Sequence, residues 1–368
     1  MPSMVAALAA AAASSRLSPL AAITVTDLLK ENDKTLWKLK LYKDPASHFE
    51  DFDSFCRALS ENTTVTSLEV TWRFLRHLTQ TQRITLMEAI GGLANLEEIA
   101  IEVVGPTFVL TAALRKASKL KSLRIGKLRF LTNQDVQGLA AALLCCKNLQ
   151  QLSLSSVQIM VQGNHIMDAA GIVLFQENQQ EGREKIGLDP LLDAMASLPV
   201  LEHIRLQHYL SGSKIQPPTE RSLRSLCHSP RRSLIFGSCG LSDEQCVTIA
   251  DELKTNRASS DLSILVVTRN YKITSFGWDV FVQMLAKNET LLDFHPGEEG
   301  QRNAPSTEQK AKINYYLKLN QAGRGKLRGS MTERRKAWFD LLVQGSKLKD
   351  LDIVFFAMQV DPSLYIID

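Results

Sequence analysis

Residues 262–270, LSILVVTRN, carry the clearest pattern of hydrophobic and polar positions in the chain. Leu262, Leu265 and Val267 have the spacing of inward-facing residues on a short strand, which ends before Asn270. The preceding residues, 238–256, contain Ser242 and Gln245 at capping-box spacing. Apolar positions at helical spacing follow them, namely Val247, Ile249, Ala250 and Leu253. A strand–helix unit of about thirty residues cannot bury its apolar face alone, so the pattern predicts copies of itself.

The same strand pattern recurs along most of the chain. Subtracting successive first anchors gives intervals of 29, 31, 24, 29, 52, 30, 31 and 29 residues, and six of these lie within two residues of thirty. Such regularity is typical of a repeat architecture. The anchors are Leu36/Leu39/Leu41, Val65/Leu68/Val70, Leu96/Ile99/Ile101, Leu120/Leu123/Ile125, Leu149/Leu152/Leu154, Leu201/Ile204/Leu206, Leu262/Leu265/Val267 and, more loosely, Arg231/Leu234/Phe236 and Leu291/Phe294.

Helical patterns fill the intervals between the strands. Short strands that alternate with helices at this spacing imply a parallel sheet with the helices on its outer face. The fold class is therefore α/β, a solenoid of about nine parallel strands. Asn62, Asn148, Asn256 and Asn288 stand where helices end, and we expect them to adopt the left-handed conformation of a helix C-cap.

The repeat pattern sets the expected domain boundaries, with the solenoid over residues 24–300. The 24-residue interval leaves room only for a short helix, and the 52-residue interval predicts an insertion over residues 160–187. Residues 301–368 carry three apolar, helix-like runs, which fit a cap over the last repeat. Residues 1–23 are rich in alanine and fit a disordered leader, although targeting to an organelle stays an alternative to a cytoplasmic protein.

Composition narrows the class of protein. The chain is 45% hydrophobic and 22% charged, as in a soluble folded protein, and its net charge of +4 does not by itself indicate nucleic-acid binding. No apolar run reaches the length of a membrane span. The six cysteines follow no disulfide or metal-binding spacing, so we interpret them as reduced thiols of an intracellular protein.

Residues 234–270 resemble the leucine-rich repeat of ribonuclease-inhibitor-like proteins. The resemblance lies in CGLSDEQC, a helix ending ADELKTN, and LSILVVTRN. Cys239 and Asn270 match the family position whose side chain turns inward at the bend after the strand, whereas Arg73, Val104 and Leu128 depart from it. The tail, with INYYLKLNQAGRGKL and DPSL, resembles C-terminal segments of algal repeat proteins. A repeat motif specifies architecture more than activity.

This resemblance implies a concave strand face that binds a protein partner. Residues that alternate with the anchors would face it, and they run from basic through acidic to apolar. Such a mosaic fits a protein better than a polyanion, although an ordinary solvated face is the alternative. The partner-binding candidates are Lys38, Lys40, Tyr42, Glu69, Glu98, Arg124, Gln151, His203, Arg205, Ile264 and Val266.

Motifs for catalysis, metals or cofactors are missing from the sequence. GRGKL at residues 323–327 lacks the spacing of a phosphate loop, and no Cys or His pair has ligand spacing. We therefore expect a monomeric, non-enzymatic interaction module without a cofactor, a metal site or a small-molecule substrate. A GTPase-activating protein is an alternative because one branch of this repeat type has that role. It would need an exposed arginine, for which Arg73 and Arg269 are weak candidates.

A basic tail leaves a third hypothesis open. Residues 308–350 contain eleven Lys or Arg and four acidic residues, a net charge of +7. Such a segment could attract an acidic protein, nucleic acid or an anionic membrane. It could equally be a solubilising surface, because no aromatic RNA-binding motif accompanies it.

Overall fold

Burial of the repeated anchors produces one parallel sheet, and the chain forms an α/β solenoid. The computed structural model describes residues 24–42, 51–102, 108–126, 129–130, 132–159, 166–167, 173–174, 186–208, 215–254, 262–297, 303–321 and 332. Nine strands lie side by side in sequence order, all parallel. They are β1 (Lys38–Leu41), β2 (Ser67–Val70), β3 (Glu98–Glu102), β4 (Ser122–Gly126), β6 (Gln151–Ile159), β10 (His203–His208), β12 (Ser233–Gly237), β13 (Ile264–Val266) and β14 (Asp293–His295).

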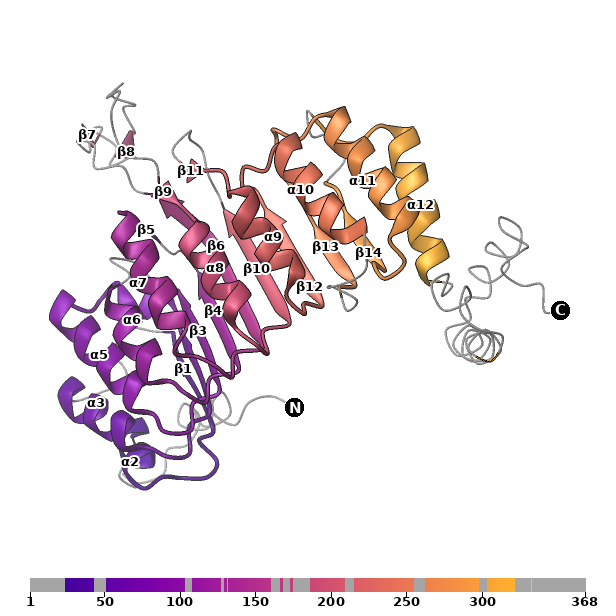
Figure 1. Cartoon of the computed structure of the whole chain (residues 1–368). Coiled ribbons are helices and arrows are strands. Elements are labelled where there is room, and N and C mark those ends of the chain that lie inside the picture. The colour runs from indigo at the N-terminus through magenta and orange to yellow at the C-terminus, as the bar shows by residue number, and fades with distance from the viewer. Residues whose placement is uncertain are drawn as a thin grey trace, which may run out of the picture.

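The helices cover one face of this sheet (Figure 1). Each of the longer helices packs against the next one along the chain, from the first described helix to the last. Within the part of the chain that the structure describes, the sheet is therefore covered by helices on one side and open on the other. The helices are α2 (Val25–Lys30), α3 (Phe52–Glu61), α4 (Trp72–Leu75), α5 (Gln80–Gly92), α6 (Phe108–Lys116), α7 (Asn133–Leu143), α8 (Asp189–Ser197), α9 (Glu220–His228), α10 (Asp243–Lys254), α11 (Ser275–Lys287) and α12 (Thr307–Gln321).

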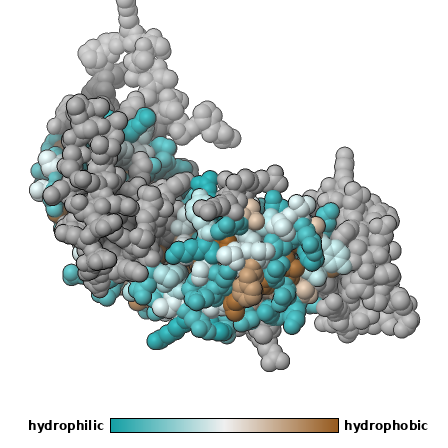
Figure 2. Space-filling view, turned by 90° about the horizontal axis from the view of Figure 1, so that it is seen from above, coloured by the Kyte–Doolittle hydropathy of each residue, from teal (hydrophilic) through white to brown (hydrophobic). Residues whose placement is uncertain are grey.

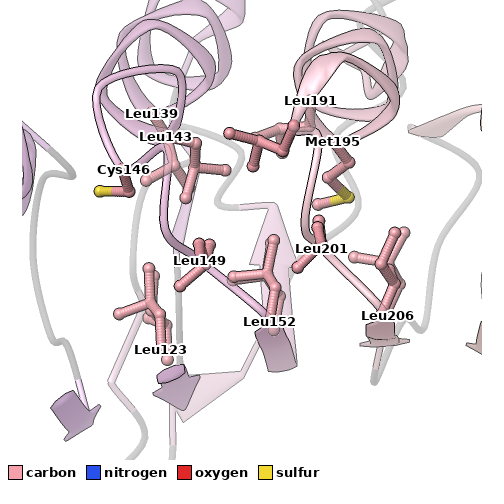
Figure 3. Packing of buried hydrophobic residues seen from close by; sticks show 14 of the residues in the cluster. Leu123, Leu139, Leu143, Cys146, Leu149, Leu152, Leu191, Met195, Leu201 and Leu206 are labelled. Carbon is pink, nitrogen blue, oxygen red and sulfur yellow. The ribbon is translucent and has the colours of Figure 1, made fainter. Parts of the chain in front are cut away.

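Layers of leucine fill the space between helices and strands (Figure 3). Leu143 of α7 and Leu191 of α8 point toward Leu149, Leu152 and their neighbours below them. All 26 predicted anchors are buried, and so are Phe55 and Leu59 of α3. The single hydrophobic core thus runs the length of the solenoid, which confirms the predicted period and the predicted inward face of every strand.

The register of the strands is fixed where each one begins. The carbonyl oxygen of Trp37, just before β1, accepts hydrogen bonds from the backbone N–H groups of Thr66 and Ser67, at 2.9 and 3.1 Å. The same double contact recurs at all eight junctions between neighbouring strands. No strand can slip by one residue without breaking it, so equivalent residues of every repeat stand in rows.

The bends before the strands are held by side chains rather than by left-handed backbone. Asn62 and Asn288 have φ of −72° and −75°, which is extended backbone, and Asn148 is not among the residues with positive φ. The expected left-handed cap is therefore wrong for these three asparagines, and Asn256 lies outside the described residues. The buried amide of Asn288 instead donates to the carbonyl of Leu253 at 2.9 Å in the preceding repeat.

Arg231 replaces an apolar anchor at one bend. Its side chain is 1% exposed, and its guanidinium donates to the carbonyls of Met195, Ala196, Leu198 and Leu201. Met195 and Ala196 lie in the last turn of α8, where helix carbonyls lack the usual partner four residues further on. Burial lowers the pKa of Arg231 to about 10. Arg231 thus donates hydrogen bonds to carbonyls of the preceding repeat, as asparagine side chains do at other bends.

Two further predictions concern the ends of units. The bend after β13 carries Asn270, which is buried and donates to the carbonyls of Phe236 and Val267, at 2.8 and 2.9 Å. Cys239 is buried too, and its thiol contacts the carbonyl of Leu206 at 3.4 Å. Both side chains turn inward as expected. The short helix predicted in the 24-residue interval is α6, with nine residues.

The predicted domain boundaries are described only in part. In the insertion over residues 160–187, the structure describes an antiparallel pair, β7 (Ile166–Met167) with β8 (Val173–Leu174), and β9 (Ile186–Gly187), which pairs with β11 (Ile215–Gln216). Beside β6 lies the short β5 (Arg129–Phe130). The leader over residues 1–23 and the second and third predicted cap helices lie outside the described residues.

The first helix of the predicted cap, α12, continues the solenoid. Ile313 and Leu317 are buried on its inner side, and α12 lies beside α11 (Figure 1). The amide of Asn320 donates to the carbonyls of Asn288 and Leu291, at 3.0 and 2.9 Å. This repeats the contact that Asn288 makes with its own preceding repeat, so α12 occupies the place of the next repeat helix.

Replacement of Leu265 by alanine tests the packed core. Because Leu265 is fully buried, we expect the free energy of unfolding to fall by about 2–5 kcal/mol in urea denaturation. Ile264→Ala on the same strand faces the open side and should cost less. Equal losses at the two positions would contradict the assigned inward face.

Replacement of Asn288 by alanine tests the bends. It leaves the carbonyl of Leu253 and the N–H groups of Thr290 and Leu291 without their partner. Each buried group left unpaired costs about 1–3 kcal/mol, so we expect a total loss of about 2–4 kcal/mol. Asn148→Ala is the matched control, because its exposed amide bonds the carbonyl of Ser118 and no other group among the described residues. A loss at Asn288 no larger than at Asn148 would refute this role.

Candidate binding face

The open face of the sheet presents side chains in two complete rows. Because side chains alternate along a strand, residues between the buried anchors all point away from the helices, and the register aligns them. One row reads Lys38, Ser67, Glu98, Ser122, Gln151, His203, Ser233, Ile264, Asp293. The next row reads Lys40, Glu69, Ala100, Arg124, Ser153, Arg205, Ile235, Val266, His295.

Ten of the eleven candidate residues from the sequence stand in these rows, and the eleventh, Tyr42, follows the last residue of β1. None of the eleven is buried, and Tyr42 is 37% exposed. The register thus brings the candidates together on one continuous face.

Besides the ten candidates, the alternation along the strands also places Ser67, Ser122 and Ser153 in the rows. Five further residues of the rows were missed by the sequence reasoning. They are Ala100, Ser233, Ile235, Asp293 and His295. Four of them lie on β12 and β14, whose anchors match the pattern only loosely. On β12 the first anchor is the charged residue Arg231. The alternation around Leu234 and Phe236 was the available signal, since it places Ser233 and Ile235 outward.

The first three strands form a self-paired, charged section. Lys40 and Glu69 make an ion pair at 2.8 Å. The carboxylate of Glu98 accepts a hydrogen bond from the hydroxyl of Ser67 at 3.1 Å, and that of Glu102 accepts one from the backbone N–H of Trp72 at 2.9 Å. The first contact joins β1 to β2, the second joins β2 to β3, and the third joins β3 to Trp72, the first residue of α4. These hydrogen bonds of the β3 carboxylates thus run toward the β2 repeat, away from β4.

The middle section carries two arginines. Arg205 donates to the neutral side-chain oxygen of Gln207, at 2.8 Å from Nη2 and 3.3 Å from Nε. For Arg124, no ion pair or hydrogen bond of the side chain is found within the described part of the chain. Both side chains are exposed. The positive charge of this section is therefore not neutralised by the described carboxylates.

The section after it is apolar. Ile235 of β12 stands beside Val266 of β13, and Ile264 adjoins Ser233. All three apolar side chains are half-buried. Beyond them, Asp293 and His295 of β14 contact each other at 3.1 Å. Figure 2, seen from above, shows a largely hydrophilic surface with hydrophobic residues gathered near the middle of the described part.

The described residues outside this face offer little chemistry. They contain no group of three or more His, Cys, Asp or Glu side chains able to hold a metal ion. Arg73 lies in α4 and Arg269 follows β13 with φ of 58°, so five strands separate these two arginines. Among the described helices, none is long and apolar enough to cross a membrane.

Five of the six cysteines are buried and only Cys145 is exposed. Burial raises the pKa of the Cys56, Cys146 and Cys227 thiols to about 12. It also raises the pKa of Cys239 and Cys246. A thiol must ionise to act as a nucleophile, so these five serve packing.

Comparisons with known proteins find likeness in structure but none in sequence. No family model matches the chain, and no curated protein matches its sequence. A Bacteroides fragilis protein from a structural-genomics consortium is similar in structure over 72% of this chain and 67% of its own, with 11% identity and a TM-score of 0.41. Yeast Rad7, solved in complex with Elc1, is similar over 76% of this chain and 81% of its own, with 15% identity and a TM-score of 0.25.

The burial of the thiols predicts a simple pattern of thiol modification. When native protein is treated with Ellman's reagent at pH 8, we expect Cys145 to react quickly and the other five cysteines only after unfolding in denaturant. Cys145→Ser should abolish the fast phase. Two or more fast thiols in the native protein would contradict the burial assigned to the others.

Proposed function

We propose that this protein is a non-enzymatic scaffold that holds a protein partner along the open strand face. The observation that carries the proposal is the continuous field of unlike, solvent-accessible side chains on strands whose opposite side is locked into the core. Such a face presents its side chains at fixed positions, so little conformational entropy is lost when a partner binds. Charged and apolar groups together favour a protein over a purely ionic ligand.

A finer assignment belongs to the same proposal. The period of about thirty residues and the inward-turned Cys239 and Asn270 support a repeat of the ribonuclease-inhibitor-like type. The buried thiols, which form no disulfide bonds, support an intracellular location. The proposed protein is a monomer. The part of the tail that resembles algal repeat proteins lies largely outside the described residues, and the cap over residues 301–368 stays part of the proposal.

Affinity capture from the native cell tests the proposal. The bait is the full chain, compared with Lys40→Glu/Arg124→Glu/Arg205→Glu, which reverses three charges on the open face. The control Arg57→Glu/Arg115→Glu/Arg221→Glu makes the same change in net charge at exposed helix positions. We expect at least one partner to be captured by the wild-type and control proteins and lost by the open-face variant.

The opposite result would overturn the proposal. If the open-face variant, shown to be folded by circular dichroism, captured the same proteins as the wild type, then the strand face would not be the binding surface.

A further inference from the structure

We propose that the middle of the open face, from β4 to β13, binds an acidic segment of a partner protein that also carries apolar side chains. This inference rests on the proposed function and specifies its partner.

Carboxylates are absent from the outward positions of these five strands. The outward residues on β4, β6, β10, β12 and β13 whose surroundings the structure describes are Ser122, Arg124, Gly126, Gln151, Ser153, Ser155, His203, Arg205, Gln207, Ser233, Ile235, Gly237, Ile264 and Val266. The outward acids of the described rows lie on either side, on β2 and β3 and on β14. The middle section is therefore positive between two negative borders.

The two arginines are open to a ligand. The Lys40–Glu69 pair shows that a cation of this face can be neutralised by the neighbouring strand. Arg124 has no such partner among the described residues, and the carboxylate of Glu98 on β3 is hydrogen-bonded to Ser67 of β2 instead. Among the described residues, the guanidinium of Arg205 bonds only the amide oxygen of Gln207. A guanidinium in this state can bind a carboxylate in a bidentate, charge-assisted way.

The order of residues gives the segment a direction. The second row reads Arg124, Ser153, Arg205, Ile235, Val266. At a strand spacing of about 4.8 Å, the arginines stand about 10 Å apart and the whole row spans about 19 Å. An extended segment of about six residues covers this distance. Its acidic part would lie over β4 to β10 and its apolar part over β12 and β13.

The borders and the small residues make this placement selective. Acidic side chains of the segment would be repelled by Glu98 and Glu102 on one side and by Asp293 on the other. Serine and glycine around the arginines leave room above the sheet for the ligand's side chains. The apolar contact with Ile235 and Val266 distinguishes this segment from a plain polyanion such as a nucleic acid.

Selection from a random peptide library tests the inference without assuming a partner. Peptides of about twelve residues, twice the length of the row, are displayed on phage and selected on the immobilised full chain. We expect the enriched sequences to combine two or more Asp or Glu with aliphatic or aromatic residues. Enrichment of basic or uncharged sequences, or no enrichment at all, would overturn the inference.

Variants then locate the binding of the best acidic peptide. Arg124→Glu/Arg205→Glu should weaken it by about tenfold or more, and Ile235→Thr/Val266→Thr should weaken it while retaining the β-branched shape. Arg57→Glu/Arg221→Glu, with the same change in charge on the helices, should leave the affinity unchanged. An affinity that survives the Arg124/Arg205 reversal, or one that falls equally in the control, contradicts the site.

A single-stranded oligo(dT) of comparable length serves as the polyanion arm. Binding of this oligonucleotide more tightly than the best peptide, with loss in the Arg124/Arg205 variant, would make the section a nucleic-acid site and overturn the inference. The two experiments distinguish this inference from the proposed function. If cellular partners depend on the open face while the enriched peptides lack acidic residues, the scaffold function is supported and only the acidic partner is contradicted.

Discussion

The double hydrogen bond at the start of each strand is the constraint on which the remaining structure depends. A carbonyl of one repeat accepts two N–H groups of the next, at every junction from Trp37 to Ser263. This contact fixes the register, and the register decides both which leucines meet in the core and which polar side chains meet on the open face. The same alignment therefore produces each layer of the core and each row of side chains on the open face.

The bends before the strands show how one physical requirement can be met by different residues. Helix ends leave carbonyls that need donors, and the solenoid supplies them from the following repeat. Asn62 and Asn288 do so with an amide, and their carboxamide oxygens also bind N–H groups of the next turn. Arg231 does so with a buried guanidinium that reaches four carbonyls, although its Nε has no partner among the described residues.

These bends also mark the limit of what sequence can predict. The anchors, the parallel order, the inward faces of the helices and the inward role of Asn270 follow from local patterns, because each copy repeats the same burial. The conformation of Asn62 does not, since its donor role depends on Leu29, thirty-three residues earlier. Ile235 was missed for a related reason. The first anchor of its strand is the charged Arg231, and only the tertiary contacts of the guanidinium explain why this residue is buried.

On the open face, the sequence predicts which side chains are present but not which of them are already paired. Glu98 lies between Ser67 and Ser122 in its row, and alternation alone does not say toward which strand its carboxylate turns. The structure shows it bonded to Ser67, which leaves Arg124 without that acid. Specificity in a solenoid therefore depends on pairing between strands as much as on composition. Arg124 and Arg205 have no carboxylate partner among the described residues, and the sheet holds them about 10 Å apart. Two such arginines can define a ligand better than the net charge of the whole chain.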